Sequence, residues 1–214
     1  MIAIGIRCLL AYLLGSLMGS LLVGRVYGGV DIRTQGSGNA GATNALRTQS
    51  KVFALWVLAI DLGKGVLATD FVAHMPMPHM RGELALGPGW TMAFCGALAV
   101  VGHVFPVFYG FRGGKGAATF LGALAVIAPL ALVPALAVFA LTLMLSGYVG
   151  LSTVLATWGV AAFLLARCGP ASPQFAFGLA MALFILYTHR SNMRRLLAGT
   201  ENRFTRAMLL RRPK

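Results

Sequence analysis

The chain has 214 residues, of which 58% are hydrophobic and only 11% are charged. Because a soluble domain carries about 25% charged residues, this composition argues against a soluble enzyme, a disordered chain and a secreted disulfide scaffold, and it predicts an integral membrane protein with one domain over residues 1–214. In a membrane protein, the net charge of +13 indicates cytoplasmic basic segments and sites for anionic ligands rather than a nucleic-acid surface.

The first predicted element is a membrane span over residues 2–23. The apolar run is longer than the core of a signal peptide, which has about 7–15 residues, and no clear cleavage site follows it. Gly15 and Gly19, each followed by a serine, place small residues four positions apart on one helical face. Such a face favours close packing against another helix.

Residues 24–51 form the first basic segment, whose centre at 36–47 is rich in glycine. Glycines at near-alternating positions let successive backbone N–H groups line a concave surface that binds an anion. Five side chains in this stretch add hydrogen-bond donors: Ser37, Asn39, Thr43, Asn44 and Arg47. We therefore expect a phosphate site here rather than an ordinary flexible turn.

A second span is predicted over residues 52–73, and it carries Asp61 and Lys64 inside it. Charged side chains inside a bilayer are costly and usually face a cavity or each other. Their spacing of three residues allows them to pair on one helix face. A structural pair and a functional role both stay open.

A loop over residues 74–88 leads to a third span over residues 89–109, and the second basic segment follows. That segment contains Arg112-Gly113-Gly114-Lys115-Gly116, which is similar in composition to a phosphate-binding loop. The glycine spacing is one residue short of a Walker motif, and Gly116 stands where that motif has serine or threonine for magnesium. A phosphate bound without an obligatory metal fits better than a nucleotide. His103, near the end of the span, is more typical of a packed histidine than of a catalyst.

Residues 116–188 separate the second basic segment from the third. Basic segments stay on the cytoplasmic side, so an even number of spans connects them. Four crossings use about 18 residues each, close to the roughly 20 that a bilayer core needs. We therefore predict an all-α membrane protein with seven transmembrane helices, its N-terminus outside and its C-terminus in the cytoplasm. Five spans with re-entrant or interfacial pieces is the alternative.

The third basic segment covers residues 189–201 and begins with His189 and Asn192, which face the same way on a helix. Its apolar positions also form a stripe, so an amphipathic interfacial helix and a ligand site are both open. The basic tail over residues 202–214 is expected to anchor the chain on the cytoplasmic side.

Few groups in the three basic segments suit a metal, since Asp31 and Glu201 are their only acidic residues. The three cysteines have no metal-binding spacing and are expected to be free: Cys8, Cys95 and Cys168. No metal and no cofactor is expected. A phosphate-bearing substrate next to a lipid-facing site suggests lipid head-group synthesis.

Three strings in this sequence resemble the signature motifs of the bacterial acyl-phosphate-dependent glycerol-3-phosphate acyltransferases, the membrane-integral PlsY family. They are GSGNAGATNALR at 36–47, GHVFPVFYGFRGGKGAAT at 102–119 and HRSNMRRLLAGTE at 189–201. The run DLGKG at 61–65 is also similar, and the likeness covers essentially the whole chain. Arg112 stands where many members have lysine, which keeps the positive charge.

This resemblance implies seven transmembrane helices in the bacterial cytoplasmic (inner) membrane, with the active site on the cytoplasmic face. It implies transfer of a fatty acyl group from acyl phosphate to the 1-hydroxyl of glycerol 3-phosphate, which yields lysophosphatidate and inorganic phosphate in the first acylation of phospholipid synthesis. A monomer in the lipid bilayer suffices for this reaction. The His-x4-Asp signature of other glycerophosphate acyltransferases is absent from all four histidines.

The resemblance also assigns residues to the reaction. The catalytic residues would be Ser37, Arg47, His189 and Asn192. The phosphates would be bound by Gly38, Asn39, Thr43, Asn44, Gly113, Gly114, Lys115 and Gly116. Two further candidates are His103 and Lys64, whereas Glu201 would be structural. The general base stays open between His189 and a phosphate of the substrate.

Two other classes of protein fit part of the pattern. A transporter of an organic phosphate would share the spans and the positive charge, but no two-fold internal repeat is evident. A CDP-alcohol phosphotransferase needs a cluster of aspartates on membrane helices, which Asp61 and Asp70 alone do not supply.

Overall fold

A computed structural model describes residues 2–77 and 86–209, and every regular element in these ranges is a helix, as predicted. The chain forms two compact units, Met1–Ile127 and Ala128–Lys214, which are described separately. The assignment of residues 1–214 to one domain stays a prediction. The end of the basic tail, residues 210–214, lies outside the described residues.

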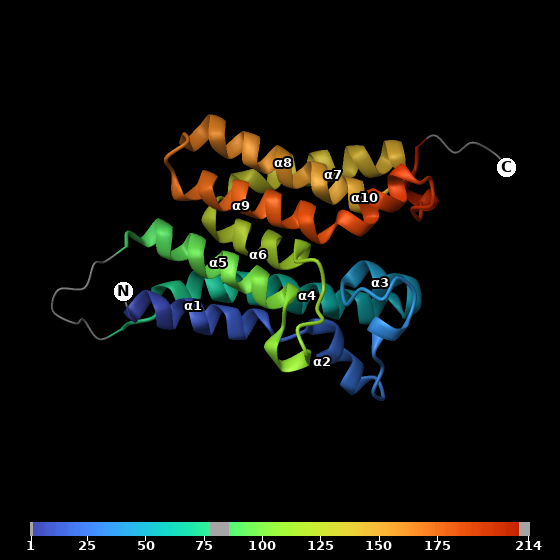
Figure 1. Cartoon of the computed structure of the whole chain (residues 1–214), viewed down its shortest axis with the longest axis horizontal. Helices are drawn as coiled ribbons and strands as arrows, with labels where there is room; N and C mark the ends of the chain where they lie inside the picture. The colour runs from blue at the N-terminus through green and yellow to red at the C-terminus, as the bar shows by residue number, and fades with distance from the viewer. Residues whose placement is uncertain (1, 78–85, 210–214) are drawn as a thin grey trace. The chain divides into compact units, whose positions relative to one another are not determined.

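In the described part of the first unit there are six α-helices, and the longer ones run alongside one another (Figure 1). They are α1 (Ile2–Gly15), α2 (Gly19–Val26), α3 (Ala42–Thr48), α4 (Lys51–Leu67), α5 (Pro88–Val104) and α6 (Ala117–Ile127), with the short helices η1 (Ile32–Thr34), η2 (Ala68–Val72) and η3 (Val107–Tyr109). Helix α1 packs against α5, and α4 packs against α6, α3 and α2. The π-helical turn η2 continues α4 and packs on α1 and α5.

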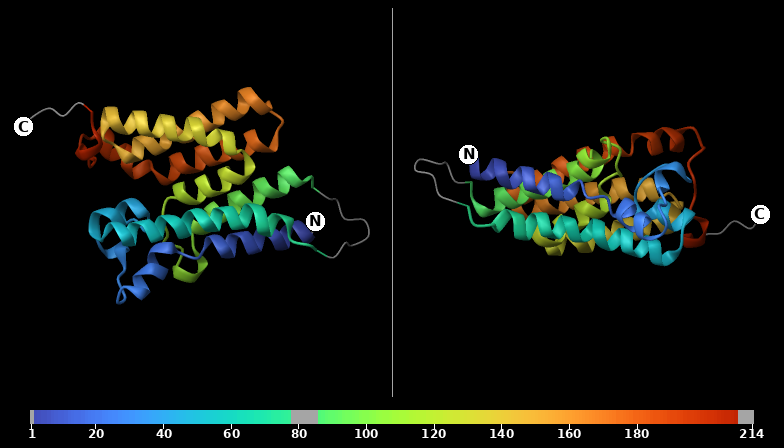
Figure 2. Two further views of the ribbon diagram at one scale, coloured as in Figure 1. Left: turned by 180° about the vertical axis from the view of Figure 1, so that it is seen from behind. Right: turned by 90° about the horizontal axis from the view of Figure 1, so that it is seen from below.

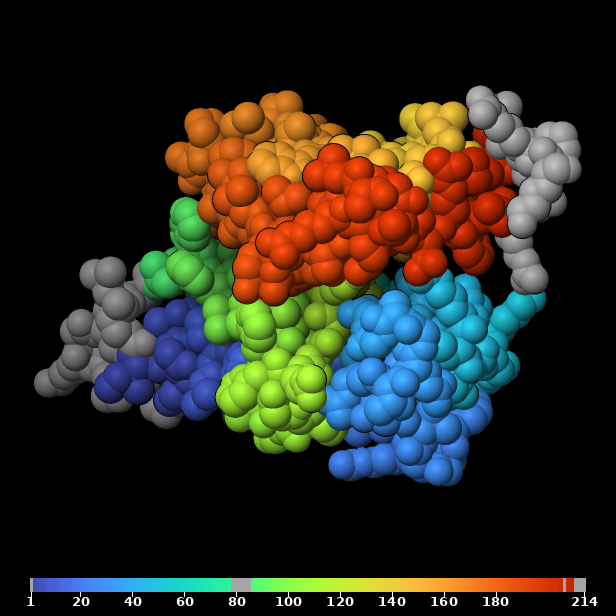
Figure 3. All heavy atoms as spheres, turned by 45° about the vertical axis from the view of Figure 1, so that its right-hand side comes forward, coloured from blue at the N-terminus to red at the C-terminus, as the bar shows by residue number. Residues whose placement is uncertain are grey.

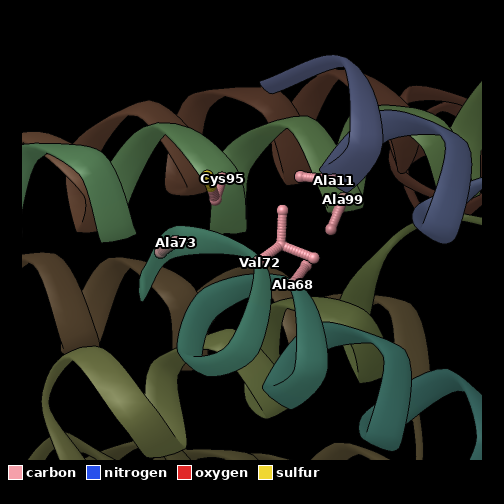
Figure 4. Close-up of a cluster of buried hydrophobic side chains, with 6 residues drawn as sticks. All are labelled: Ala11, Ala68, Val72, Ala73, Cys95 and Ala99. Carbon is pink, nitrogen blue, oxygen red and sulfur yellow. The ribbon is translucent and has the colours of Figure 1, made fainter. Parts of the chain in front are cut away.

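Small side chains fill the core between α1, η2 and α5 (Figure 4), where the buried residues are Ala11, Ala68, Val72, Ala73, Cys95 and Ala99. Backbones approach closely here, because a Cβ atom on Gly15 would collide with the carbonyl of Ala99, and one on Gly102 would collide with the carbonyl of Tyr12. The close packing predicted for Gly15 is therefore confirmed. Helices α4 and α6 cross in the same way, with Gly65 against the carbonyl of Thr119.

The first span is bent rather than straight, since α1 and α2 meet at 44° across a short break. Side chains of α4 bind the backbone groups at this break: Lys64 Nζ donates to the carbonyl of Leu17 at 2.8 Å, and Asp61 Oδ1 accepts from the N–H of Gly19 at 3.4 Å. A helix kink has a local cause, and here the charged pair replaces hydrogen bonds that a continuous helix would form. The span predicted over residues 2–23 thus corresponds to a bent pair of helices.

Within the described residues, four helical stretches are long and apolar enough to cross a membrane: Lys51–Val72, Pro88–Tyr109, Pro129–Ser146 and Val149–Cys168. The bent pair of α1 and α2 adds a fifth if it is taken as one span. Helix α6 and helix α9 (Pro173–Thr188) are apolar but shorter. The composition and these helices agree with an integral membrane protein.

The second unit begins with η4 (Pro129–Ala131) and contains α7 (Leu132–Ser146), α8 (Val149–Cys168), α9, α10 (Arg190–Leu197) and η5 (Thr205–Ala207). Helix α8 packs against both α7 and α9, and the further views in Figure 2 show these three helices running side by side. The short helix α10 packs on α8 and α9. Ser172 caps α9 by accepting a hydrogen bond from the N–H of Phe175 at 3.2 Å.

Candidate active site

Asn44 organises the loop that we call the first loop, residues 31–47. Its side chain is 1% exposed, and all of its hydrogen bonds stay within the loop. Its Oδ1 accepts from the N–H of Ser37 at 2.9 Å and from the hydroxyl of Ser37 at 3.1 Å, and its Nδ2 donates to the carbonyls of Ile32 and Gln35 at 2.9 and 3.0 Å. Asn44 therefore shapes the loop, and its predicted contact with a phosphate stays a prediction.

Glycine is required where the first loop turns around Asn44. Gly36 has φ +55° and Gly38 has φ +70°, and a Cβ atom on Gly36 would collide with the Asn44 amide. Both φ values favour glycine over any other residue. The predicted site residues of this loop face outward to different degrees: Ser37, Gly38, Thr43 and Arg47 are exposed, and Asn39 is partly buried.

The second loop, residues 110–116, folds back along the end of α5. The N–H of Gly113 donates to the carbonyl of Val104 at 3.2 Å, and the N–H of Gly114 donates to the carbonyl of His103 at 3.1 Å. Gly116, with φ +87°, then lies against the side chain of Val100. Helix α6 starts directly after it, so the second loop is recessed beside the last turns of α5.

Helix α6, which follows the second loop, has 11 residues. In the second loop, Gly114 and Gly116 are buried. Lys115, between them, is partly buried.

Arg33 joins the first loop to the second loop, and the sequence analysis did not single it out. Its NH1 donates to the carbonyls of Arg112 and Tyr109 at 3.1 and 3.4 Å, and its other nitrogens pair with Asp31, the closest contact being 2.8 Å. The hydrogen bonds and charge of Arg33 hold the pKa of Asp31 below its ordinary value. The two segments lie next to each other on the molecular surface (Figure 3), in lighter blue and yellow-green. In the sequence, the spacing of Asp31 and Arg33 was the signal from which their pairing could have been predicted.

Three buried polar side chains lie beneath the second loop, and we call them the buried triad: Asp61, Lys64 and His103. Lys64 Nζ lies 3.0 Å from Asp61 Oδ1, which confirms the predicted pair. His103 Nδ1 lies 3.4 Å from the same oxygen. All three are at most 3% exposed, so the two candidates Lys64 and His103 face the interior of the first unit rather than its surface.

The third segment belongs to the second unit. His189 is buried at the end of α9, and its Nδ1 lies 2.8 Å from the carbonyl of Ile185. A carbonyl only accepts hydrogen bonds, so this contact assigns the proton of the neutral ring to Nδ1 and leaves Nε2 as the basic nitrogen. Asn192 Nδ2 donates to Glu201 Oε1 at 2.6 Å, and Arg195 pairs with the other oxygen of Glu201 at 2.7 Å. Glu201 thus holds α10 and the following turn together.

The structure brings two of the three predicted segments together, since the first and second loops meet within the first unit. His189, between α9 and α10, and Asn192, in α10, belong to the second unit, and the expectation that they face the same way stays a prediction. Among the described residues, no three His, Cys, Asp or Glu side chains form a group that could hold a metal ion.

Comparison with known proteins gives a consistent result. The family model described as glycerol-3-phosphate acyltransferase matches residues 5–199. Among curated relatives, the glycerol-3-phosphate acyltransferase of Chlorobium limicola is 39% identical, covering 91% of this chain and 94% of the relative, and that of Synechococcus elongatus is 41% identical, covering 91% of each.

Two solved structures are also similar. Both are crystal structures of PlsY (YgiH), an integral membrane glycerol 3-phosphate acyltransferase. The glycerol 3-phosphate form has a TM-score of 0.80 and 32% identity, covering 94% of this chain and 95% of that one. The lysophosphatidic acid form has a TM-score of 0.78 and 31% identity, covering 94% of each chain.

Proposed function

The chain belongs to the glycerol-3-phosphate acyltransferase family, and from this premise we propose that it transfers a fatty acyl group from acyl phosphate to the 1-hydroxyl of glycerol 3-phosphate. The products are lysophosphatidate and inorganic phosphate. The observation that carries this proposal is the pair of similar structures, one a glycerol 3-phosphate form and the other a lysophosphatidic acid form, because these molecules are the acceptor and the product of such a transfer.

The chemistry requires little beyond orientation and positive charge. The 1-hydroxyl oxygen attacks the acyl carbon, the bond from that carbon to the phosphate oxygen breaks, and the hydroxyl proton passes to a base. Acyl phosphate is an activated mixed anhydride, so the main barrier is to bring two anions together in the correct geometry. Fixed cations and preorganised donors lower that barrier.

The first and second loops supply such groups. In the first loop, the proposed contacts to phosphate or the reacting atoms come from Ser37, Gly38, Asn39, Thr43, Asn44 and Arg47. In the second loop, Lys115 and its neighbours Gly113, Gly114 and Gly116 bind the phosphate of glycerol 3-phosphate. The start of α6 directly after Gly116 supports this assignment, because a helix N-terminus favours an anion. Neither loop requires a cofactor.

His189 and Asn192 serve the same reaction in this proposal. The hydrogen bond from His189 Nδ1 to the carbonyl of Ile185 fixes the tautomer and orientation of the ring, which supports His189 as the general base. A phosphate oxygen of the substrate is the second candidate base. Glu201 positions Asn192 through its 2.6 Å hydrogen bond.

The proposed topology has seven spans, with the active site on the cytoplasmic face of the bacterial inner membrane. Seven apolar stretches support it: the bent pair of α1 and α2, α4 with η2, α5, α6, η4 with α7, α8, and α9. The basic segments 24–51, 110–115 and 190–214 then share the cytoplasmic side, because two spans and four spans separate them. The N-terminus lies outside, and a monomer suffices.

Purified protein in lipid, without added metal, tests the proposal. Glycerol 3-phosphate is supplied with palmitoyl phosphate and, separately, with palmitoyl-CoA, and both lysophosphatidate and phosphate are measured. We expect lysophosphatidate from palmitoyl phosphate only, with one phosphate released per product. Formation of lysophosphatidate from palmitoyl-CoA would contradict the proposal that acyl phosphate is the acyl donor. If folded protein gives no product from either donor, the result would favour the alternative function, a transporter of an organic phosphate. Uptake of glycerol 3-phosphate into sealed vesicles would then test that alternative.

A further inference from the structure

The buried triad contacts three separate parts of the first unit. Lys64 binds the carbonyl of Leu17 at the break between α1 and α2, and Asp61 binds the N–H of Gly19 on the other side of that break. His103 reaches Asp61 from α5. The triad therefore joins the bent first span, α4 and the end of α5.

His103 also forms the floor of the second loop. Its carbonyl accepts from the N–H of Gly114 at 3.1 Å. Its ring lies so close to Gly114 that the three atoms nearest to a Cβ added there all belong to the imidazole. The position of this ring thus limits how deeply the loop before Lys115 can enter the first unit.

The triad is poorly explained as a device for stability alone. Replacing a buried ion pair by apolar residues is often neutral or stabilising. Among the described residues, Asp61 Oδ2 is also buried without a hydrogen-bond partner, and His103 Nδ1 has the 3.4 Å contact with Asp61 Oδ1 but no well-aligned hydrogen bond. An arrangement whose buried polar atoms are incompletely hydrogen-bonded is not optimised for folding free energy, which favours a role in placing its neighbours.

We propose that Asp61, Lys64 and His103 are positioning residues for glycerol 3-phosphate: Lys64 fixes the orientation of Asp61, Asp61 fixes the ring of His103, and that ring sets the depth of the second loop. None of the three reaches the surface, so they act through Gly114 and Lys115 rather than on the substrate. This inference rests on the proposed role of the second loop in binding glycerol 3-phosphate.

A double-mutant cycle between His103 and Gly114 tests the inference. Gly114→Ala places a methyl group against the imidazole, so it should raise the KM for glycerol 3-phosphate about tenfold or more and lower the unfolding temperature. His103→Ala removes the obstacle. The double variant should therefore have a lower KM for glycerol 3-phosphate and a higher unfolding temperature than Gly114→Ala alone. Such a non-additive effect is the mark of two side chains in contact.

Gly113 supplies the matched control, because a Cβ atom there would collide with the backbone carbonyl of His103 rather than with its ring. Truncating His103 cannot relieve that collision, so the pair His103→Ala and Gly113→Ala should show no relief. His103→Ala alone should raise KM about tenfold while kcat changes less than about threefold. The reason is that, in this proposal, the second loop binds the phosphate equally in the ground state and in the transition state.

Two results would overturn the inference. One is equal impairment of Gly114→Ala with and without His103→Ala; the other is a loss confined to kcat. The unfolding temperatures, measured without substrate, keep this test separate from the proposed function. An inactive wild-type protein would refute the proposed function, whereas the unfolding temperatures of the same variants would still decide whether His103 positions the loop.

Discussion

The first and second loops are both rich in glycine and both face phosphate chemistry in the proposed reaction, yet they are held in different ways. Asn44 and the pair of Asp31 and Arg33 hold the first loop, and all three lie within it. The second loop rests on the buried triad, whose members come from α4 and α5. Local side chains thus shape one loop, and buried side chains from distant parts of the sequence shape the other.

The largest effect should follow from breaking the triad. Asp61→Asn leaves the ammonium of Lys64 buried without its counter-charge, and losing one partner of a buried pair costs about 3–5 kcal/mol. Thermal unfolding in detergent should show a large loss. Asp70→Asn is the matched control, because Asp70 is an exposed carboxylate in η2, which continues α4. Asp61→Asn combined with Lys64→Met should recover most of the loss, and a loss equal to that of Asp61→Asn alone would contradict a paired charge.

The next effect concerns the charge that the second loop presents. Lys115→Ala should raise the KM for glycerol 3-phosphate about 10- to 100-fold, since a hydrogen bond to a charged group contributes about 1.5–3 kcal/mol. The unfolding temperature should change little. Lys51→Ala removes an exposed cation at the start of α4 and should leave KM unchanged. An unchanged KM in Lys115→Ala would remove Lys115 from the binding site.

In the first loop, Asn44→Ala and Ser37→Ala should separate shape from chemistry. Asn44→Ala removes four hydrogen bonds and should loosen the loop by about 1–3 kcal/mol, seen as faster hydrogen exchange at the N–H of Ser37. Ser37→Ala keeps the backbone hydrogen bond to Asn44 and loses only the hydroxyl. It should leave exchange unchanged while lowering turnover sharply. Normal turnover of Ser37→Ala would make the first loop purely structural.

The smallest effect is expected where the two loops touch. Arg33 lowers the pKa of Asp31 from its ordinary value of 3.8, so the pair stabilises the fold above that value and loses its contribution as pH falls through the lowered pKa. Because both side chains are partly exposed, the contribution is less than about 1 kcal/mol. The protection factor for hydrogen exchange at the N–H of Arg33, which is corrected for the intrinsic pH dependence of exchange, should fall below pH 3.8 and stay constant above it. Asp31→Asn should abolish this acid step.

The difference between the loops also explains what the sequence could reveal. A stretch whose contacts are local can be interpreted from its own residues: the composition of residues 36–47 argued against an ordinary flexible turn, whereas phosphate binding there stays a prediction. The pair of Asp61 and Lys64 was predicted for the same reason, since both lie on one helix face. Asn44 was predicted to bind phosphate, and its residue type did not reveal that its amide also binds its own loop.

Long-range features were not accessible from the sequence. The bend between α1 and α2 depends on α4, which supplies groups that bind the broken backbone. The contact of His103 with Asp61 joins residues 42 positions apart, and no pattern along the chain fixes that distance. Arg33 was counted only as part of a basic segment, because its role arises when the second loop folds back against it.

The placement of both charges of the ion pair on one helix has a consequence for biosynthesis. Asp61 and Lys64 are three residues apart, so they can neutralise each other as soon as α4 coils, before α5 has been synthesised. A span with an internally compensated pair enters the bilayer with a lower desolvation penalty than one with a single charge. This charge compensation depends on α4 alone and does not require the partner helix α5.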